Sequence, residues 1–199
     1  YRPFRVGNDV TEANAALKPE RLQGLEAGVS RKGAKGLVEA TAFWNRIEDP
    51  VVNVTLGAGP GTFPIGGFIP AGGVLRQRQN AGRIDAIGLE GRAERTVGAV
   101  TLTSALSVTD ARLDGGSAAP QLTGKRPAQA PIWSATAGLS AQLREGLVLA
   151  TDLTWEGKRF EDDLNSRVLD PAWRLDARLD WRVRPLVTAY VAGDNLLDA

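Results

Sequence analysis

The feature that most constrains the fold is a strict alternation of apolar and charged residues in segment 172–183, AWRLDARLDWRV. Apolar side chains occupy every second position from Trp173 to Val183, and Arg or Asp occupies every position between them. Successive side chains point to opposite faces of a β-strand, so this strand would have one apolar face and one charged face. No helical template fits the segment as well. The chain is therefore expected to build a sheet whose two faces meet different surroundings.

The same alternation recurs from Arg21 to the end of the chain, and helical periodicity is nearly absent. We predict strands over residues 22–30, 37–47, 83–95, 99–109, 131–143, 147–155, 172–183 and 186–192. Each is close to the roughly 9–11 residues that a tilted strand needs to cross a bilayer. The prediction is an all-β chain of about eight antiparallel strands.

The connections between these strands alternate between two kinds. Short connections with Gly or Pro and a basic residue lie at 31–36, 95–98, 144–146 and 182–185. Long connections begin after Leu56, at Asp110 and at Glu156. Bacterial outer-membrane barrels place short turns on the periplasmic side and long loops outside the cell. We therefore expect segments 57–73 and 110–130 to be mobile loops exposed outside the cell.

The tryptophans favour the same placement. Trp44, Trp133, Trp155 and Trp173 lie at the long-loop ends of their strands, and Trp181 lies near a short-turn end. Aromatic girdles at the two membrane interfaces would produce this distribution. The alternative is that these bulky residues close the ends of a soluble core.

Composition excludes several classes of function. Lys plus Arg is 24 and Asp plus Glu is 23, so a net charge of +1 argues against a nucleic-acid binder with a strongly basic surface. The chain has no Cys, His or Met, which removes disulfides, thiolate and imidazole metal sites, and Ser-His or Cys-His catalysis. Nothing marks a carboxylate as a general acid. We expect no enzymatic activity, no cofactor and no metal.

Two local motifs could suggest a ligand site. The run EDDLN, residues 161–165, lacks the spacing and central Gly of an EF-hand loop, so we expect an exposed acidic loop. The run GAGPG, residues 57–61, is not followed by Lys-Ser/Thr or by a helix, so we expect a mobile loop and not a phosphate cradle.

Three stretches carry a family resemblance: NAALKPERLQGLEAGV (14–29), QNAGRIDAIGLEGRAE (79–94) and AYVAGDNLLDA (189–199). In this order they resemble the C-terminal part of the TonB-dependent outer-membrane receptors, with Leu197 where Phe is usual in the last motif. The resemblance implies an antiparallel transmembrane β-barrel segment, the fourteenth to twenty-first strands of a 22-stranded barrel. Residues 1–199 would then be the C-terminal part of the barrel, without the plug domain and the last strand.

The resemblance also implies a function. Such receptors import iron chelates, cobalamin and some sugars through the outer membrane of Gram-negative bacteria. The implied partners are outer-membrane lipid, the plug domain of the same parent chain, TonB through an absent N-terminal region, and a small-molecule nutrient, foremost an iron chelate. Two alternatives stay open. One is a complete small eight-stranded outer-membrane barrel with a structural or adhesive role, and the other is a soluble β-barrel binding domain.

Charged positions on two strands are the candidate contacts with a ligand or a plug. We expect lumen-facing side chains at Arg83, Asp85, Glu90 and Arg92, and at Arg174, Asp176, Arg178, Asp180 and Arg182. The alternative is a solvated lumen wall in which these charges form structural ion pairs. The five tryptophans are the candidate membrane-interface residues.

Overall fold

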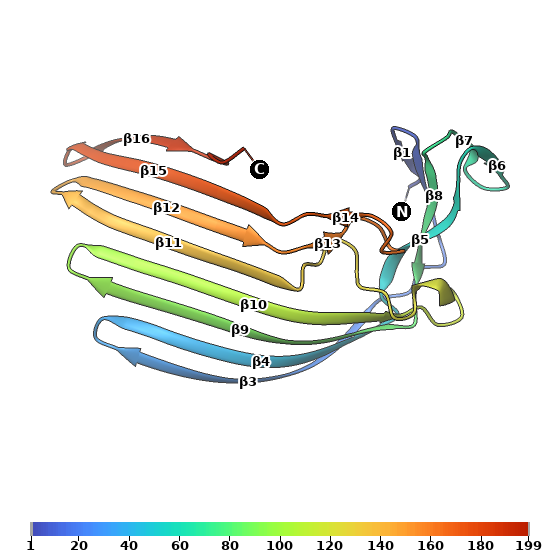
Figure 1. Ribbon diagram of the computed structural model, residues 1–199, viewed down its shortest axis with the longest axis horizontal. Coiled ribbons are helices and arrows are strands. Elements are labelled where there is room, and N and C mark those ends of the chain that lie inside the picture. The colour runs from blue at the N-terminus through green and yellow to red at the C-terminus, as the bar shows by residue number, and fades with distance from the viewer. Residues whose placement is uncertain (1, 199) are drawn as a thin grey trace.

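The computed structural model describes residues 2–198, and a single sheet of eight long antiparallel strands dominates it (Figure 1). The order across this sheet is β16-β15-β12-β11-β10-β9-β4-β3. Its strands are β3 (Arg21–Gly33), β4 (Gly36–Glu48), β9 (Arg83–Val97), β10 (Val100–Asp114), β11 (Trp133–Arg144), β12 (Leu147–Glu156), β15 (Ala172–Arg184) and β16 (Val187–Gly193). The eight strands expected from the alternation are confirmed, and the structure extends most of them by one to five residues.

Short turns and long connections lie at opposite ends of this sheet, as the sequence predicts (Figure 1). Two residues separate the strands of each hairpin β3–β4, β9–β10, β11–β12 and β15–β16. Two of these turns need the left-handed backbone conformation, which Gly98 and Gly146 adopt with φ of 61° and 72°. The first long strand, β3, runs towards the short-turn end.

Two hairpins carry a β-bulge beside the turn. The pairing register shifts between Gln142 and Arg144 in β11, and again between Arg182 and Arg184 in β15. Each shift adds one residue to the strand that enters the turn, so the residues after it change face. These bulges decide which way the last arginine of each strand points.

The eight-stranded sheet is open within the described part of the chain. Strands β3 and β16 are its two edges, and each pairs on one side alone. The sheet is a curved wall and not a closed barrel (Figure 1).

A second sheet fills the long-connection end. It consists of β1 (Phe4–Val6), β2 (Asp9–Glu12), β8 (Val74–Asn80) and β5 (Val51–Ala58), in this order, with β2 and β8 parallel. Smaller elements accompany it: the hairpins β6–β7 (Gly61–Phe63, Gly67–Ile69) and β13–β14 (Arg159–Phe160, Val168–Leu169), and the 3₁₀ turn η1 (Pro120–Leu122). The segments expected to be mobile loops, 57–73 and 110–130, contain β6, β7 and η1. No strand was expected from the sequence at β1, β2, β5 or β8, although Val52, Val54 and Leu56 alternate with polar residues.

The GAGPG run is part of this folded region. Gly59 donates its N–H to the carbonyl of Gly73 at 2.9 Å. A Cβ at Gly59 would collide with the carbonyl oxygens of Ile69 and Pro70, so this close approach of two backbones requires glycine.

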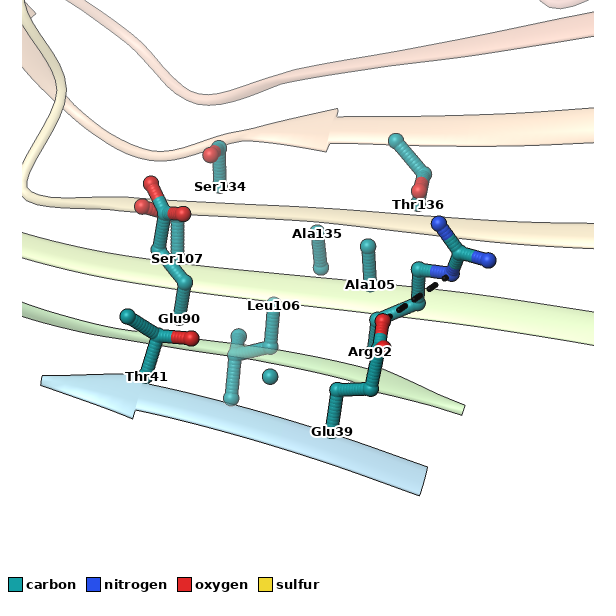
Figure 2. Close-up of a pocket in the computed structure, with 11 residues that line it drawn as sticks. Glu39, Thr41, Glu90, Arg92, Ala105, Leu106, Ser107, Ser134, Ala135 and Thr136 are labelled. Carbon is teal, nitrogen blue, oxygen red and sulfur yellow. Dashed lines mark ion pairs between the residues drawn. The ribbon is translucent and has the colours of Figure 1, made fainter. Parts of the chain in front are cut away.

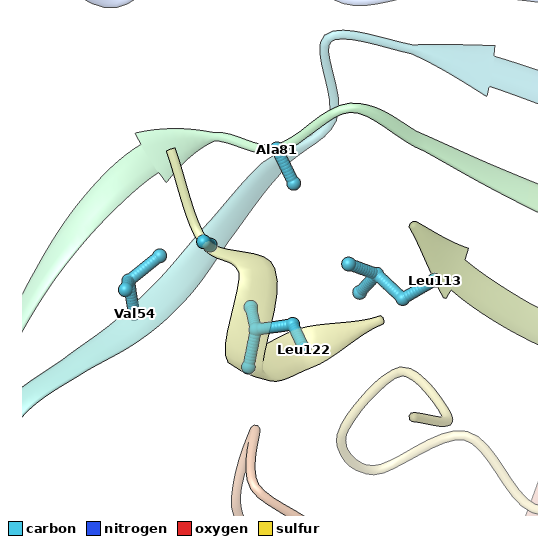
Figure 3. Close-up of a cluster of buried hydrophobic side chains, with 5 residues drawn as sticks. Val54, Ala81, Leu113 and Leu122 are labelled. Carbon is cyan, nitrogen blue, oxygen red and sulfur yellow. The ribbon is translucent and has the colours of Figure 1, made fainter. Parts of the chain in front are cut away.

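Most of the buried apolar side chains lie at the long-connection end. One cluster contains Val54, Ala81, Leu113, Ala119 and Leu122, and Figure 3 shows four of them converging around η1. A second cluster contains Val10, Ile69 and Leu75. Every residue of β3 is exposed, in contrast. No helix within residues 2–198 is long and apolar enough to span a membrane.

Candidate functional site

One face of the eight-stranded sheet is apolar and carries all five tryptophans. Residues directly opposite each other in an antiparallel pair share a face, as do alternate residues of one strand. Trp173 lies opposite Trp155, with ring centroids 6.0 Å apart, and this row continues through Ala135 and Leu106. We call this surface the apolar face, and its tryptophans are Trp44, Trp133, Trp155, Trp173 and Trp181.

The opposite surface, the polar face, holds seven of the nine charged side chains expected to line a lumen. The register links Glu90 to Ser107, Ser134 and Glu156 on the intervening strands, and Glu156 lies opposite Ala172 at the start of β15. The seven residues on this face are Glu90, Arg92, Arg174, Asp176, Arg178, Asp180 and Arg182. The structure therefore brings the β9 and β15 candidates to one surface.

Arg83 and Asp85 lie on the other side of the sheet. The register of β9 is uninterrupted, so these odd-numbered positions share the apolar face with Ile87, beyond its tryptophans at the long-connection end. Asp85 accepts hydrogen bonds from Arg46 Nε at 2.7 Å and from Arg83 Nε at 2.9 Å. The expectation that all four β9 charges share one face is wrong for these two residues, because a separation of an odd number of residues reverses the face of a strand.

The charges of β15 pair along their own strand. Arg174 Nε lies 3.1 Å from Asp176, and Arg178 makes contacts of 2.7 to 3.0 Å with both oxygens of Asp180. The Arg178 guanidinium also lies 3.9 Å from the ring centroid of Tyr190. Exposed pairs of this kind add little stability, so their main effect is to hold the side chains in place.

A depression of about 360 Å³ opens on the polar face across β4, β9, β10 and β11 (Figure 2). Its charged members are Glu39, Glu90 and Arg92, and Arg92 Nε lies 3.8 Å from Glu39. Small side chains, among them Ala105, Ser107 and Ser134, leave the space above the sheet open. Within residues 2–198, Glu90 forms no ion pair. The depression offers hydroxyl groups and one unpaired carboxylate to a polar ligand or polypeptide segment.

Side-chain hydrogen bonds tie the three long connections together. Asp163 accepts from the backbone N–H and the hydroxyl of Thr55, both at 2.8 Å, and so joins the β12–β15 connection to β5. Asn165 exchanges two hydrogen bonds with the backbone of Arg126, at 2.8 and 2.9 Å. Arg126 in turn lies 2.7 Å from Asp110. The three connections therefore form one interlocked region.

The EDDLN run lies inside this region and is not an exposed acidic loop. Asp162 and Asp163 are 7% and 8% exposed. Burial alone would raise the pKa of Asp162, but the Arg167 N–H and the hydroxyl and N–H of Ser166 donate to its carboxylate and hold the pKa below its usual range. Sequence reasoning missed this fold, although Asp, Asn and Ser in one short run favour such local hydrogen bonds.

A second depression, of about 410 Å³, lies between these connections. Arg76 and Arg126 line it together with Glu161, Asp162 and Asp163. Among residues 2–198, no group of three or more His, Cys, Asp or Glu side chains is arranged to hold a metal ion. This second depression is lined by two arginines that are in ion pairs, Arg76 and Arg126, and by the buried carboxylates of Asp162 and Asp163.

Comparisons with known proteins agree with the fold. A family model described as "TonB dependent receptor-like, beta-barrel" matches residues 2–196. The ferric yersiniabactin uptake receptor FyuA from Yersinia pestis has a TM-score of 0.68 and 19% identity, over 90% of this chain and 25% of that chain. A mutant of the ferric enterobactin receptor PfeA from Pseudomonas aeruginosa has a TM-score of 0.66 and 19% identity, over 94% and 27%. The FrpB iron transporter from Neisseria meningitidis has a TM-score of 0.63 and 18% identity, over 95% of this chain and 28% of that chain.

The chain spans between 25% and 28% of the length of these solved structures. At such identities the likeness shows the fold alone. A comparison with curated protein sequences finds no match.

Proposed function

Because the chain belongs to the TonB-dependent receptor-like β-barrel family, we propose that it forms part of the barrel wall of a receptor that imports a scarce nutrient through the outer membrane of a Gram-negative bacterium. One observation carries the proposal. The eight-stranded sheet separates an apolar face with all five tryptophans from a charged face, with two-residue turns at one end and folded connections at the other. This is the design of an outer-membrane barrel wall.

In this proposal the apolar face meets lipid and the polar face meets the lumen. The tryptophans lie at the membrane interfaces, where amphipathic rings are favoured. The seven polar-face candidates and the depression around Glu90 contact the nutrient or the plug domain of the parent chain. Arg83 and Asp85 are not among these contacts, because they lie on the opposite face.

Residues 1–199 would stand near the end of a 22-stranded barrel, with one further strand pairing with β16. The motif at Asn195–Asp198 supports this place, since it resembles the family's motif on the penultimate strand. The plug domain and the region that binds TonB would belong to the preceding part of the parent chain. TonB then drives the transport step, and the barrel wall takes part in no covalent chemistry.

An iron chelate is the nutrient that the relatives favour. Two of the similar structures are named for ferric yersiniabactin and ferric enterobactin, and the third for iron transport. Such a chelate would contact two surfaces: the outer surface of the three interlocked connections, and the polar face of the sheet.

The test uses the full-length receptor that contains this segment, expressed in a host without ferric-siderophore receptors of its own. Uptake is measured with radioactive iron for catecholate, hydroxamate and phenolate chelates, and with radioactive cobalt for cobalamin as a fourth nutrient, in strains with and without TonB. We expect saturable uptake of one chelate class that disappears without TonB. Surface-exposed receptor with no TonB-dependent uptake of any of the four would contradict the proposal.

The 199-residue chain expressed alone is the matched control. It should give no uptake, because the open edges of β3 and β16 leave backbone N–H and C=O groups unpaired in lipid at several kcal/mol each. Saturable TonB-dependent uptake by cells that make only these residues would overturn the role proposed for the plug.

A further inference from the structure

Four arginines lie on the apolar face at the short-turn end of the sheet. We call them the turn-end arginines: Arg31, Arg95, Arg144 and Arg184. Each of the four hairpins supplies one, from the strand that enters its turn. This regularity is separate from the charged residues of the polar face.

The register places these side chains on the apolar face. Arg95 lies opposite Leu102, in a row that continues through Leu139, and Arg31 lies opposite Val38. The other two depend on the bulges. Without the register shift, Arg144 would share the polar face with Gln142, but the bulge pairs it with Leu147 instead.

The bulge of β15 has the same effect. It pairs Arg184 with Val187, whereas Arg182 before it remains on the polar face opposite Thr188. Two independent irregularities therefore turn an arginine towards the apolar side, which a regular hairpin of the same sequence would not do.

The turn-end arginines are exposed, and within residues 2–198 none of them forms an ion pair. Their cross-strand partners are apolar: Val38, Leu102, Leu147 and Val187 lie opposite Arg31, Arg95, Arg144 and Arg184. The other end of the same face differs, because Arg46 and Arg83 there share Asp85. In the short-turn halves of the strands, the apolar face carries no Asp or Glu among the described residues.

An unpaired arginine at the rim of a lipid-facing surface can bind the phosphate of a lipid headgroup. Its aliphatic stem lies on apolar surface and its guanidinium reaches the headgroup level. The planar guanidinium matches the geometry of a phosphate and binds it through two parallel hydrogen bonds. One strand lies between each turn-end arginine and the next, so two inter-strand spacings place neighbouring arginines roughly 10 Å apart across the sheet. This spacing suits neighbouring phospholipid headgroups.

We infer that the turn-end arginines bind the phosphates of anionic phospholipids, phosphatidylglycerol or cardiolipin, in the leaflet that contacts the short turns. The inference rests on the membrane placement proposed above. It adds a lipid-binding belt that neither nutrient binding nor the TonB-dependent step requires.

The test uses the purified full-length receptor in nanodiscs of phosphatidylethanolamine that contain a quarter phosphatidylglycerol or cardiolipin. Native mass spectrometry counts the anionic lipids that stay bound after release from the disc. Replacing the turn-end arginines with Gln should weaken retention about fivefold for each arginine removed, the expected attraction of one cation at an anionic surface. Replacing all four with Lys keeps the charge but loses the two parallel hydrogen bonds, so it should restore part of the retention.

The matched control neutralises the same number of arginines on the polar face: Arg92→Gln, Arg174→Gln, Arg178→Gln and Arg182→Gln. It changes the net charge equally and should leave lipid retention unchanged. The single variants Arg144→Gln and Arg184→Gln give the same comparison if the fourfold variant does not fold, with folding followed by heat-modifiable mobility in gels.

Equal retention by the apolar-face and polar-face variants would overturn the inference. So would equal retention of phosphatidylethanolamine and anionic lipid by the unmodified receptor, or complete displacement by millimolar inorganic phosphate, which would indicate a generic anion site. If the receptor does not insert into a bilayer, both the lipid-binding inference and the membrane placement on which it rests are overturned. If the unmodified receptor retains anionic lipid but takes up no nutrient, the proposed transport function is contradicted and the lipid-binding inference is not.

Discussion

The wall of eight long strands and the folded region at its long-connection end are built by opposite rules. In the wall, large apolar side chains are exposed, and Leu25 and Val29 are each 73% exposed. In the folded region, Leu122 and Ile69 are completely buried. One region has its apolar groups outside and the other has them inside. In the membrane placement proposed above, this difference fits a single chain to two solvents, with lipid around the wall and water around the connections.

The forces that hold each region differ accordingly. Burial of apolar surface from water stabilises the folded connections, as in a small soluble domain. The wall has no such core of its own, and its strands are held by backbone hydrogen bonds that matter most where no water can replace them. Substitutions should therefore follow different rules in the two regions.

The largest effect is expected in the core of the connections. Leu122→Ala should destabilise this region by about 2–5 kcal/mol, because it leaves a cavity among side chains that cannot all close around it. Hydrogen exchange of residues 51–58 and 120–126 in the full-length receptor measures the loss. The control, Ile65→Ala at a position that is 44% exposed, should cost far less. Equal acceleration of exchange in both variants would mean that the cluster is not a core.

The next effect is expected in the wall. Ala177→Arg places a cation on the apolar face near the middle of β15 and should cost about 2–4 kcal/mol of barrel stability, as cations do at the bilayer midplane. Arg178→Ala, on the polar face, should cost much less. Denaturant titration of the full-length receptor in lipid vesicles compares the two. Equal costs would show that the faces are assigned wrongly.

The smallest effect is expected at the joint between connections. Asp163→Ala removes the acceptor for both the N–H and the hydroxyl of Thr55 and should cost about 1–3 kcal/mol locally. Hydrogen exchange of β5 and of residues 159–169 should rise together. The control is Glu161→Ala, whose exposed ion pair with Arg167 spans 3.6 Å and contributes less than about 1 kcal/mol. If β5 exchange does not change in Asp163→Ala, the connections are not coupled.

The face on which each candidate residue lies was predictable wherever the regular alternation of a strand decides it. Trp173 and Arg178 fall on opposite faces because they are an odd number of residues apart in the regular part of β15, before its bulge, and the structure agrees. The same rule separates Arg83 from Glu90, so the error there came from grouping charges by proximity in the chain. Asp163 could not be predicted as a joint, because its partner Thr55 lies 108 residues away.

The amino-acid sequence alone determined the eight strands, their antiparallel order through short turns, and which face of each regular strand is apolar. These properties follow from side-chain alternation and turn composition, which are local. Only the tertiary structure decided the bulges at Arg144 and Arg184, the parallel pairing of β2 with β8, and the burial of Asp162. Each of these depends on which backbone groups find partners across the sheet or between distant connections, and no local pattern specifies that choice.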